Sequence, residues 1–206
     1  MSVTPKEFIE RFRAENPGEQ LTYQAILVGT GRKDLFGANL RGAILRAADF
    51  RGANLQGVDL EGADLRDAIL QGADLRVASL RHADLQDADL LGANLRGAIL
   101  WDANLQDANL FGANLQNANL RGADLENANL EIANLRYATL WYANLVAANL
   151  EYANLVEADL RDANLLSANL WNANLQDANL QNANLLGANL RNAILDAGVI
   201  KELAEK

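Results

Sequence analysis

The chain has 206 residues, half of them apolar, which is enough for one domain of ordinary size or two small ones. It contains no cysteine and a single histidine, so disulfide bonds, thiolate metal sites and cysteine nucleophiles are excluded. The net charge of −9 argues against direct binding to nucleic acid or to an anionic membrane.

The first 35 residues predict an N-terminal cap that differs in sequence from everything after it. The motif TPKE at residues 4–7 is typical of a helix start. Thr at the N-cap and Glu three positions later form a capping box, and Pro suits the first helical position. Three apolar residues then share one face of this helix: Phe8, Ile9 and Phe12. The sequence Asn-Pro-Gly at residues 16–18 is expected to end it.

Residues 19–28 are compatible with a second short helix or with a strand. We favour a helix that faces the following region with Leu21, Ala25 and Ile26. The beginning of the chain carries charges throughout and lacks the apolar core of a secretory signal peptide. No segment approaches the roughly 18 apolar residues that a membrane-spanning helix requires. The sequence therefore predicts a cytoplasmic protein without a membrane segment.

A five-residue repeat occupies residues 36–195 without insertion, giving 32 pentapeptides of the form x-x-Ala-(Asn/Asp)-Leu. The last position is Leu except at Phe50, and the third is Ala except at Val58. A helix would spread residues spaced five apart around its circumference, and a straight strand would alternate them between its faces. The period therefore predicts a chain that bends every five residues, with Leu and Ala inside and the other three positions outside.

Such a chain coils, and each side of a coil pairs with the same side of the next coil at about 4.8 Å, the spacing of adjacent strands. Ala is expected beside Leu because the converging walls leave no room for a second large side chain. Asn and Asp are expected at the corners, since they hydrogen-bond to local backbone and tolerate turn geometry. The packed interior offers no cavity for a substrate.

The repeats ANLRGAIL, GADLRDAIL and GANLQNANL resemble those of the pentapeptide-repeat family, and the N-terminal helical cap is similar to that of cyanobacterial members. The resemblance implies an all-β solenoid, a right-handed quadrilateral β-helix in which four repeats make one coil. The 32 pentapeptides then give about eight coils. We expect a helical cap over residues 1–35, the β-helix over 36–195 and a short C-terminal cap helix over 196–206. The last coil is expected to be closed by Ile194, Val199, Ile200 and Leu203.

In a 20-residue coil, outward side chains 20 residues apart stack in columns. One column alternates Arg with Trp at residues 81, 101, 121, 141 and 161, which suits cation–π stacking. Another contains an apolar stripe at residues 146, 166 and 186. With the nearby outward rings, this stripe forms a candidate surface for a partner or a dimer contact: Tyr137, Trp141, Tyr142, Val146, Tyr152, Leu166 and Leu186. The alternative is that these rings only cover backbone and stabilise neighbouring coils.

The same side is expected to be acidic nearer the N-terminus, where seven carboxylates gather: Asp64, Asp67, Asp84, Asp87, Asp107, Asp124 and Glu126. The repeats hold 19 acidic residues and 11 Arg, a net charge of −8. The resemblance implies one function for such a surface, because some family members protect DNA gyrase from quinolones as acidic mimics of duplex DNA. The eleven Arg weaken the acidic potential that this function needs.

The favoured hypothesis is a non-catalytic scaffold for an unknown protein partner, without catalytic residues, cofactor or metal. His82 stands alone and is interpreted as structural. The three Ser lie outside any nucleophile motif, and the glycines follow Leu as turn residues rather than forming a phosphate loop. Both a monomer and a homodimer, side by side or end to end, are compatible with the sequence.

Overall fold

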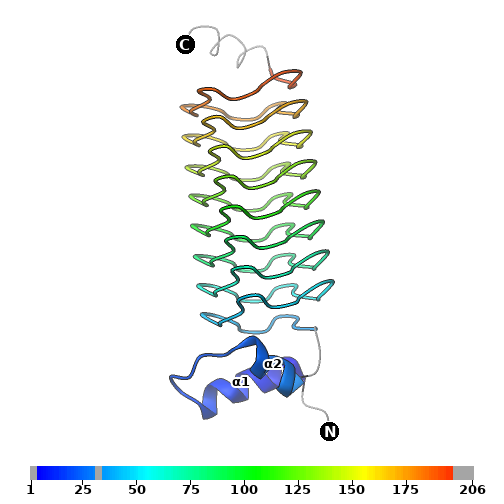
Figure 1. Cartoon of the computed structure of the whole chain (residues 1–206), viewed down its shortest axis with the longest axis vertical. Helices are drawn as coiled ribbons and strands as arrows, with labels where there is room; N and C mark the ends of the chain where they lie inside the picture. The colour runs from blue at the N-terminus through cyan, green and yellow to red at the C-terminus, as the bar shows by residue number, and fades with distance from the viewer. Residues whose placement is uncertain (1–3, 31–33, 197–206) are drawn as a thin grey trace.

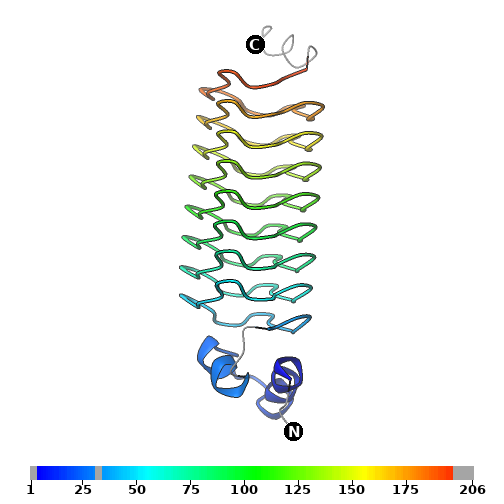
Figure 2. The ribbon, with the colours of Figure 1, turned by 90° about the vertical axis from the view of Figure 1, so that its right-hand side faces the viewer.

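The computed structural model describes residues 4–30 and 34–196, which form a straight rod of stacked coils with two helices at its N-terminal end (Figure 1). The helices are α1 (Pro5–Glu15) and α2 (Tyr23–Thr30). In the described part of the chain, every β-pairing is an isolated parallel bridge rather than part of a longer strand. Figure 2 shows, from the adjacent side, that the coils lie directly over one another.

The bridges join the fourth residue of each pentapeptide to the residue 20 positions later, as in Asn39 with Asp59 and Asp59 with Ser79. Four repeats therefore make one coil, as expected, and residues 36–195 make eight coils. At the strand spacing of about 4.8 Å per coil, the stack is roughly 38 Å long.

Each coil has four sides, centred on the bridged residues, and four corners made by the two variable residues of each pentapeptide. We define each corner and side by its residues in one coil, and residues that lie a multiple of 20 positions away belong to the same corner or side. In order they are corner A (41 and 42), side 1 (44), corner B (46 and 47), side 2 (49), corner C (51 and 52), side 3 (54), corner D (56 and 57) and side 4 (59).

The interior contains the Leu and Ala of the repeats, as predicted, and no polar or charged side chain is buried in the described part of the chain. Leu100 and Ala98, for example, have no exposed surface. Burial decreases in the last coil, where Leu185 and Leu190 are only partly buried. The two departures from the repeat, Phe50 and Val58, also point inward and are buried.

Each corner is a tight turn in which the Ala N–H donates to the carbonyl of the preceding Leu, as from Ala43 to Leu40 at 3.0 Å. The second corner residue has positive φ in all 32 repeats. This is the conformation that the third residue of a type II turn adopts, and it favours Gly, Asn and Asp. Bulky residues nevertheless occupy it at Val77 and Ile132, with φ of 52° and 59°.

The Asn and Asp residues lie at the centres of the sides, so their expected position at the corners is wrong. Their side-chain oxygens still serve the turns, because the oxygen of Asn149 accepts the N–H of Glu151, two residues later, at 3.2 Å. Their amide groups also form a ladder between coils. Asn169 donates to Asn149 at 3.1 Å, and Asn189 donates to Asn169 at 2.9 Å. An Asn side chain can both accept and donate in this ladder, whereas an ionised Asp can only accept, which explains the predominance of Asn over Asp.

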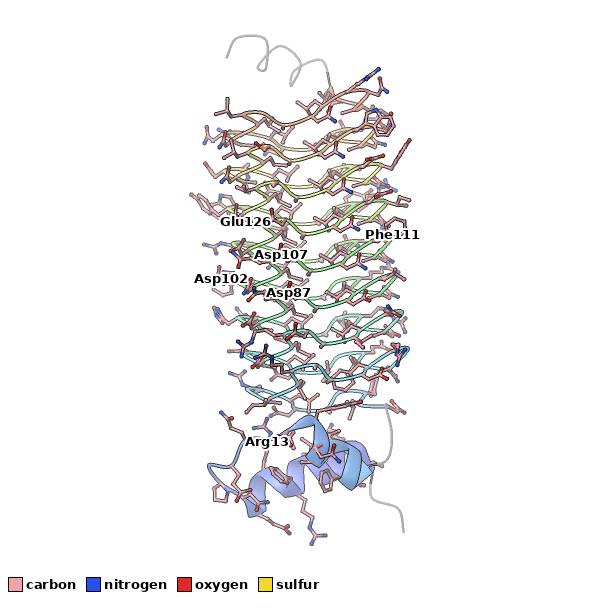
Figure 3. All side chains as sticks on the ribbon, in the orientation of Figure 1. Arg13, Asp87, Asp102, Asp107, Phe111 and Glu126 are labelled. Carbon is pink, nitrogen blue, oxygen red and sulfur yellow. The ribbon has the colours of Figure 1, made fainter. Side chains whose placement is uncertain are left out.

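The predicted start of α1 is confirmed: Thr4 is the N-cap, and both hydrogen bonds of the capping box with Glu7 are present. The helix ends at Glu15, before Gly18 with φ of 98°. From this helix Arg13 reaches the first coil, where its guanidinium donates to the carbonyls of Asn39 at 3.2 Å and Arg41 at 2.6 Å (Figure 3). In higher coils, the equivalent carbonyls accept bonds from the coil below, so Arg13 replaces a missing coil.

The segment leading into α2 completes this cap. Thr22 forms a parallel β-bridge with Ile44. The Ile44 N–H donates to the Leu21 carbonyl, and the Ile44 carbonyl accepts the Tyr23 N–H. The Tyr23 hydroxyl donates to the carbonyl beside Phe50 at 2.6 Å, and the two rings meet edge to face at 5.1 Å. The favoured helix for residues 19–28 is therefore found from Tyr23 onward, after one bridged residue. The closure expected from residues 199, 200 and 203 lies outside the described residues.

We expect Ile132→Asn to raise the free energy of unfolding by about 1 kcal/mol, because it replaces a β-branched residue at positive φ with one that tolerates it. Ile132 is 51% exposed, so little packing is lost. Denaturant unfolding measures the change. The reverse substitution at an exposed corner of the preceding repeat, Asn127→Ile, should destabilise by a similar amount. A loss of stability in Ile132→Asn would contradict this account.

Candidate functional site

The Arg–Trp column at corner A forms the predicted cation–π stack. Trp101 lies between Arg81 at 4.7 Å and Arg121 at 5.4 Å, measured from each guanidinium carbon to the ring centroid. Trp141 lies between Arg121 at 4.7 Å and Arg161 at 5.3 Å. Five side chains from five successive coils thus form one continuous stack. Guanidinium groups from the coil below and the coil above lie over each indole ring, so these rings are not free platforms for a partner.

Tyr142 extends the stack outward at the same corner. Its ring stacks on Trp141 with the centroids 4.9 Å apart and the planes at 25°. The indole N–H of Trp141 donates to Asp162 at 3.1 Å, which fixes the orientation of the indole. Tyr142 itself is 54% exposed and has positive φ. Tyr142 is therefore the ring of this corner that can meet a partner.

The seven predicted acidic residues come together on side 1 and corner B. Asp64, Asp84 and Asp124 are central residues of side 1, and the other four occupy corner B. Figure 3 shows Asp87, Asp107 and Glu126 following one another along the rod, with Phe111 on the opposite edge of the view. We call these seven residues the acidic strip.

Arginines neutralise the N-terminal part of the acidic strip. The guanidinium of Arg66 donates to both oxygens of Asp64, at 2.8 and 2.6 Å, and lies 3.4 Å from Asp84 in the next coil. These hydrogen bonds lower the pKa of Asp64. Arg46 pairs with Asp67 at 3.1 Å. The repulsion expected between stacked carboxylates is therefore relieved in these coils.

The remaining carboxylates of the acidic strip are not neutralised. Asp87, Asp107, Asp124 and Glu126 form no ion pair with any residue that the structure describes. Among the described residues, Asp124 accepts hydrogen bonds only from neutral groups, such as the side-chain amide of Gln106 at 2.7 Å. The uncompensated negative charge is therefore concentrated in the middle coils.

The candidate interaction surface is divided among the four corners. Tyr137, Trp141, Val146 and Tyr152 belong to four successive repeats of one coil, and so lie at corners D, A, B and C respectively. Residues close in sequence are thus distributed around the rod. The structure brings together only the pair Trp141 and Tyr142 and, separately, the stripe at corner B.

The stripe at corner B lies above the acidic strip, so one edge of the rod is acidic nearer the N-terminus and apolar nearer the C-terminus. Val146 and Leu166 are half-buried, and Leu186 is 72% exposed. The apolar stripe is thus most accessible in the last coil.

A second apolar column, not predicted from the sequence, lies at corner C and is formed by Leu91, Phe111, Ile132, Tyr152 and Trp171. Tyr152 packs against Trp171 with the ring centroids 5.5 Å apart, and Leu91 and Ile132 are exposed. Reading every twentieth residue from Arg51 would have revealed Leu91, Phe111 and Trp171. The sequence carries this signal because outward residues 20 positions apart share a corner.

No group of three or more His, Cys, Asp and Glu side chains that could hold a metal ion occurs in residues 4–30 and 34–196. His82 is at corner A, with Nδ1 at 4.0 Å from the Asp102 carboxylate and its ring 6.0 Å from that of Trp101. Neither α1 nor α2, the helices of the described part, is long and apolar enough to cross a membrane.

Comparison with known proteins gives one consistent family. A model of pentapeptide repeats, eight copies, matches residues 34–72, 59–90, 88–127, 128–165 and 158–196. The solved structure of HetL, a pentapeptide repeat protein involved in heterocyst differentiation regulation from the cyanobacterium Nostoc, is 36% identical over 95% of each chain, with a TM-score of 0.52. A trypsin-treated variant of QnrB1, a plasmid-mediated fluoroquinolone resistance protein, shares the fold at 19% identity, covering 83% of this chain and 88% of its own, with a TM-score of 0.65. A search of curated proteins gives no match.

We expect Arg121→Met to lower the free energy of unfolding by about 1 kcal/mol, because it removes the guanidinium that contacts both Trp101 and Trp141. Tryptophan fluorescence should change at the same time. Arg96→Met is the matched control, since Arg96 contacts no ring in the described part of the chain. Equal effects of the two substitutions on stability and fluorescence would contradict a specific contribution of the stack.

Proposed function

Because the chain belongs to the pentapeptide-repeat family, we propose that it is a non-catalytic scaffold that binds a protein partner through the outside of its rod. The observation that carries this proposal is the interior, which is filled by Leu and Ala and holds no polar side chain in the described residues. Chemistry in an enclosed site requires polar groups held in a cavity. Recognition on the outer surface is what the architecture supports best. We also propose that the coils have the right-handed sense implied by the family resemblance.

The likeness to HetL supports a regulatory role for such a scaffold. That protein is involved in heterocyst differentiation regulation, and it matches this chain over 95% of both lengths. We propose that the present chain has a regulatory role, which it performs by binding a partner. The apolar stripe of corner B, next to unneutralised carboxylates, supplies both the contact area and the charge that a selective interface needs.

Substitution of two residues of the apolar stripe tests whether the chain binds a partner through this surface. We expect Leu166→Lys with Leu186→Lys to abolish capture of a partner from native lysate, or self-association measured by sedimentation velocity, while the circular dichroism spectrum stays unchanged. The matched control is Gln116→Lys with Gln176→Lys, which places the same two charges at corner D, away from the stripe and from the acidic strip. If self-association and partner capture are unchanged in the stripe variant, the stripe is not an interface.

A second candidate is a DNA mimic that binds DNA gyrase or a related topoisomerase, and the acidic strip is the observation that favours it. From Asp64 to Asp124 the strip spans three coil steps, about 14 Å. Duplex DNA carries about eight phosphate charges over that length. The strip has seven carboxylates, but Arg46 and Arg66 pair with part of them. We therefore rank mimicry second.

A gyrase supercoiling assay tests mimicry. A mimic should inhibit or protect the enzyme at micromolar concentration, and Asp87→Asn with Asp107→Asn should weaken the effect. Asn tolerates the positive φ of both positions, so these substitutions remove charge without straining the turns. No effect of the unmodified protein on supercoiling at micromolar concentration would remove this candidate.

A further inference from the structure

A surface hollow of about 310 Å³ lies at corner D, away from the acidic strip and from the apolar stripe. Six residues line it: Gln56, Arg76, Val77, Arg96, Gly97 and Asn117. Gly97 follows Val77 and precedes Asn117 in one column of second corner residues. The hollow therefore includes a place where this column lacks a side chain.

Backbone conformation does not require glycine at this position. Asn117, one coil later, has φ of 58°, close to the 67° of Gly97. A Cβ at residue 97 would make ordinary contact with Val77 Cγ1 at 3.4 Å. An Asn at residue 97 would thus be tolerated, and Gly97 leaves space that a common residue of this repeat would occupy.

Two of the residues that line the hollow are arginines, Arg76 and Arg96, which occupy the same column in adjacent coils. Arg76 is paired with Asp74, to which its Nη2 donates at 2.6 Å, and this bonding lowers the pKa of Asp74. Arg96 forms no ion pair with any residue in the described ranges. Like charges on adjacent rungs repel. The hollow therefore keeps one uncompensated positive charge on a chain whose net charge is −9.

The other polar groups of the hollow are also suited to donate. The side-chain oxygen of Gln56 accepts from Arg76 Nη2 at 3.3 Å, which leaves its NH₂ group available. The side chains of Asn117 and Arg96 have no hydrogen-bond partner among residues 4–30 and 34–196. Val77, which is 59% exposed, provides an apolar surface next to these donors. Several free donors and one net positive charge beside an apolar patch match the chemistry of an organic anion.

We propose that this hollow binds a small organic oxyanion, a carboxylate or a phosphate monoester. The anionic oxygens lie against the guanidinium of Arg96 and the free donors of Arg76, Gln56 and Asn117. The carbon part of the ligand rests on Val77 in the space above Gly97. This site is independent of the proposed scaffold function, because none of its residues belongs to the stripe or to the acidic strip.

Titration with phenyl phosphate, inorganic phosphate and benzoate, followed by amide chemical shifts in NMR spectra, tests the proposal. We expect saturable shifts centred on Gly97 and Asn117, with phenyl phosphate binding more tightly than inorganic phosphate because of its contact with Val77. Binding of phenyl phosphate without benzoate would assign the site to phosphate monoesters, and the reverse result would assign it to carboxylates.

Two variants and two controls make the test specific. Arg96→Gln removes the uncompensated charge and Gly97→Asn fills the space, and each should weaken binding by about tenfold or more. Arg51→Gln and Gly112→Asn make the same changes at corner C and should leave binding unchanged. Equal weakening by the charge variant and its control would show non-specific attraction and overturn the proposal. Absence of saturable shifts up to about 20 mM ligand would also overturn it.

Discussion

The rod depends on one constraint, the turn that closes every fifth residue with its second corner residue at positive φ. The turn brings each Leu back to the axis, where it is buried among the other walls of the coil, and the position two residues before it is Ala in every repeat except at Val58. Because every coil repeats the same dihedral angles, the backbone groups of each side face those of the next coil. Core packing and inter-coil hydrogen bonding are therefore consequences of the same local conformation.

This regularity also determines what the surface can do. Outward side chains lie in columns. Within a column, a side chain can form an ion pair, stack on a neighbour or remain without a partner, and this differs from coil to coil. At corner A the alternating Arg and Trp side chains form cation–π contacts with one another. In the middle of the acidic strip and in the hollow at Gly97, by contrast, some charged side chains have no oppositely charged partner among the described residues. The positions that a partner or ligand would use are the ones where the column is incomplete.

Much of the fold was predictable because the five-residue period excludes helices and long strands for residues 36–195. The inward positions of Phe50 and Val58 followed from register alone. The placement of Asn at the corners failed because the period does not say where within five residues the bend falls. The eleven glycines of the repeats, all at the second corner position, held that information. The candidate surface was less predictable, since Tyr137 and Tyr152 are near in sequence but occupy different corners, and ion pairs such as Arg66 with Asp64 depend on side-chain rotamers.

The N-terminal cap has a consequence for polymerisation. The first coil of a stack has unpaired carbonyls that a preceding coil would satisfy, so uncapped rods would add to one another as fibres do. Arg13 and Tyr23 already occupy carbonyls of the first coil. A second rod could join there only by displacing Arg13 of α1 and Tyr23 of α2, whose ring packs against Phe50. Filament growth through this end is thus blocked by the chain itself.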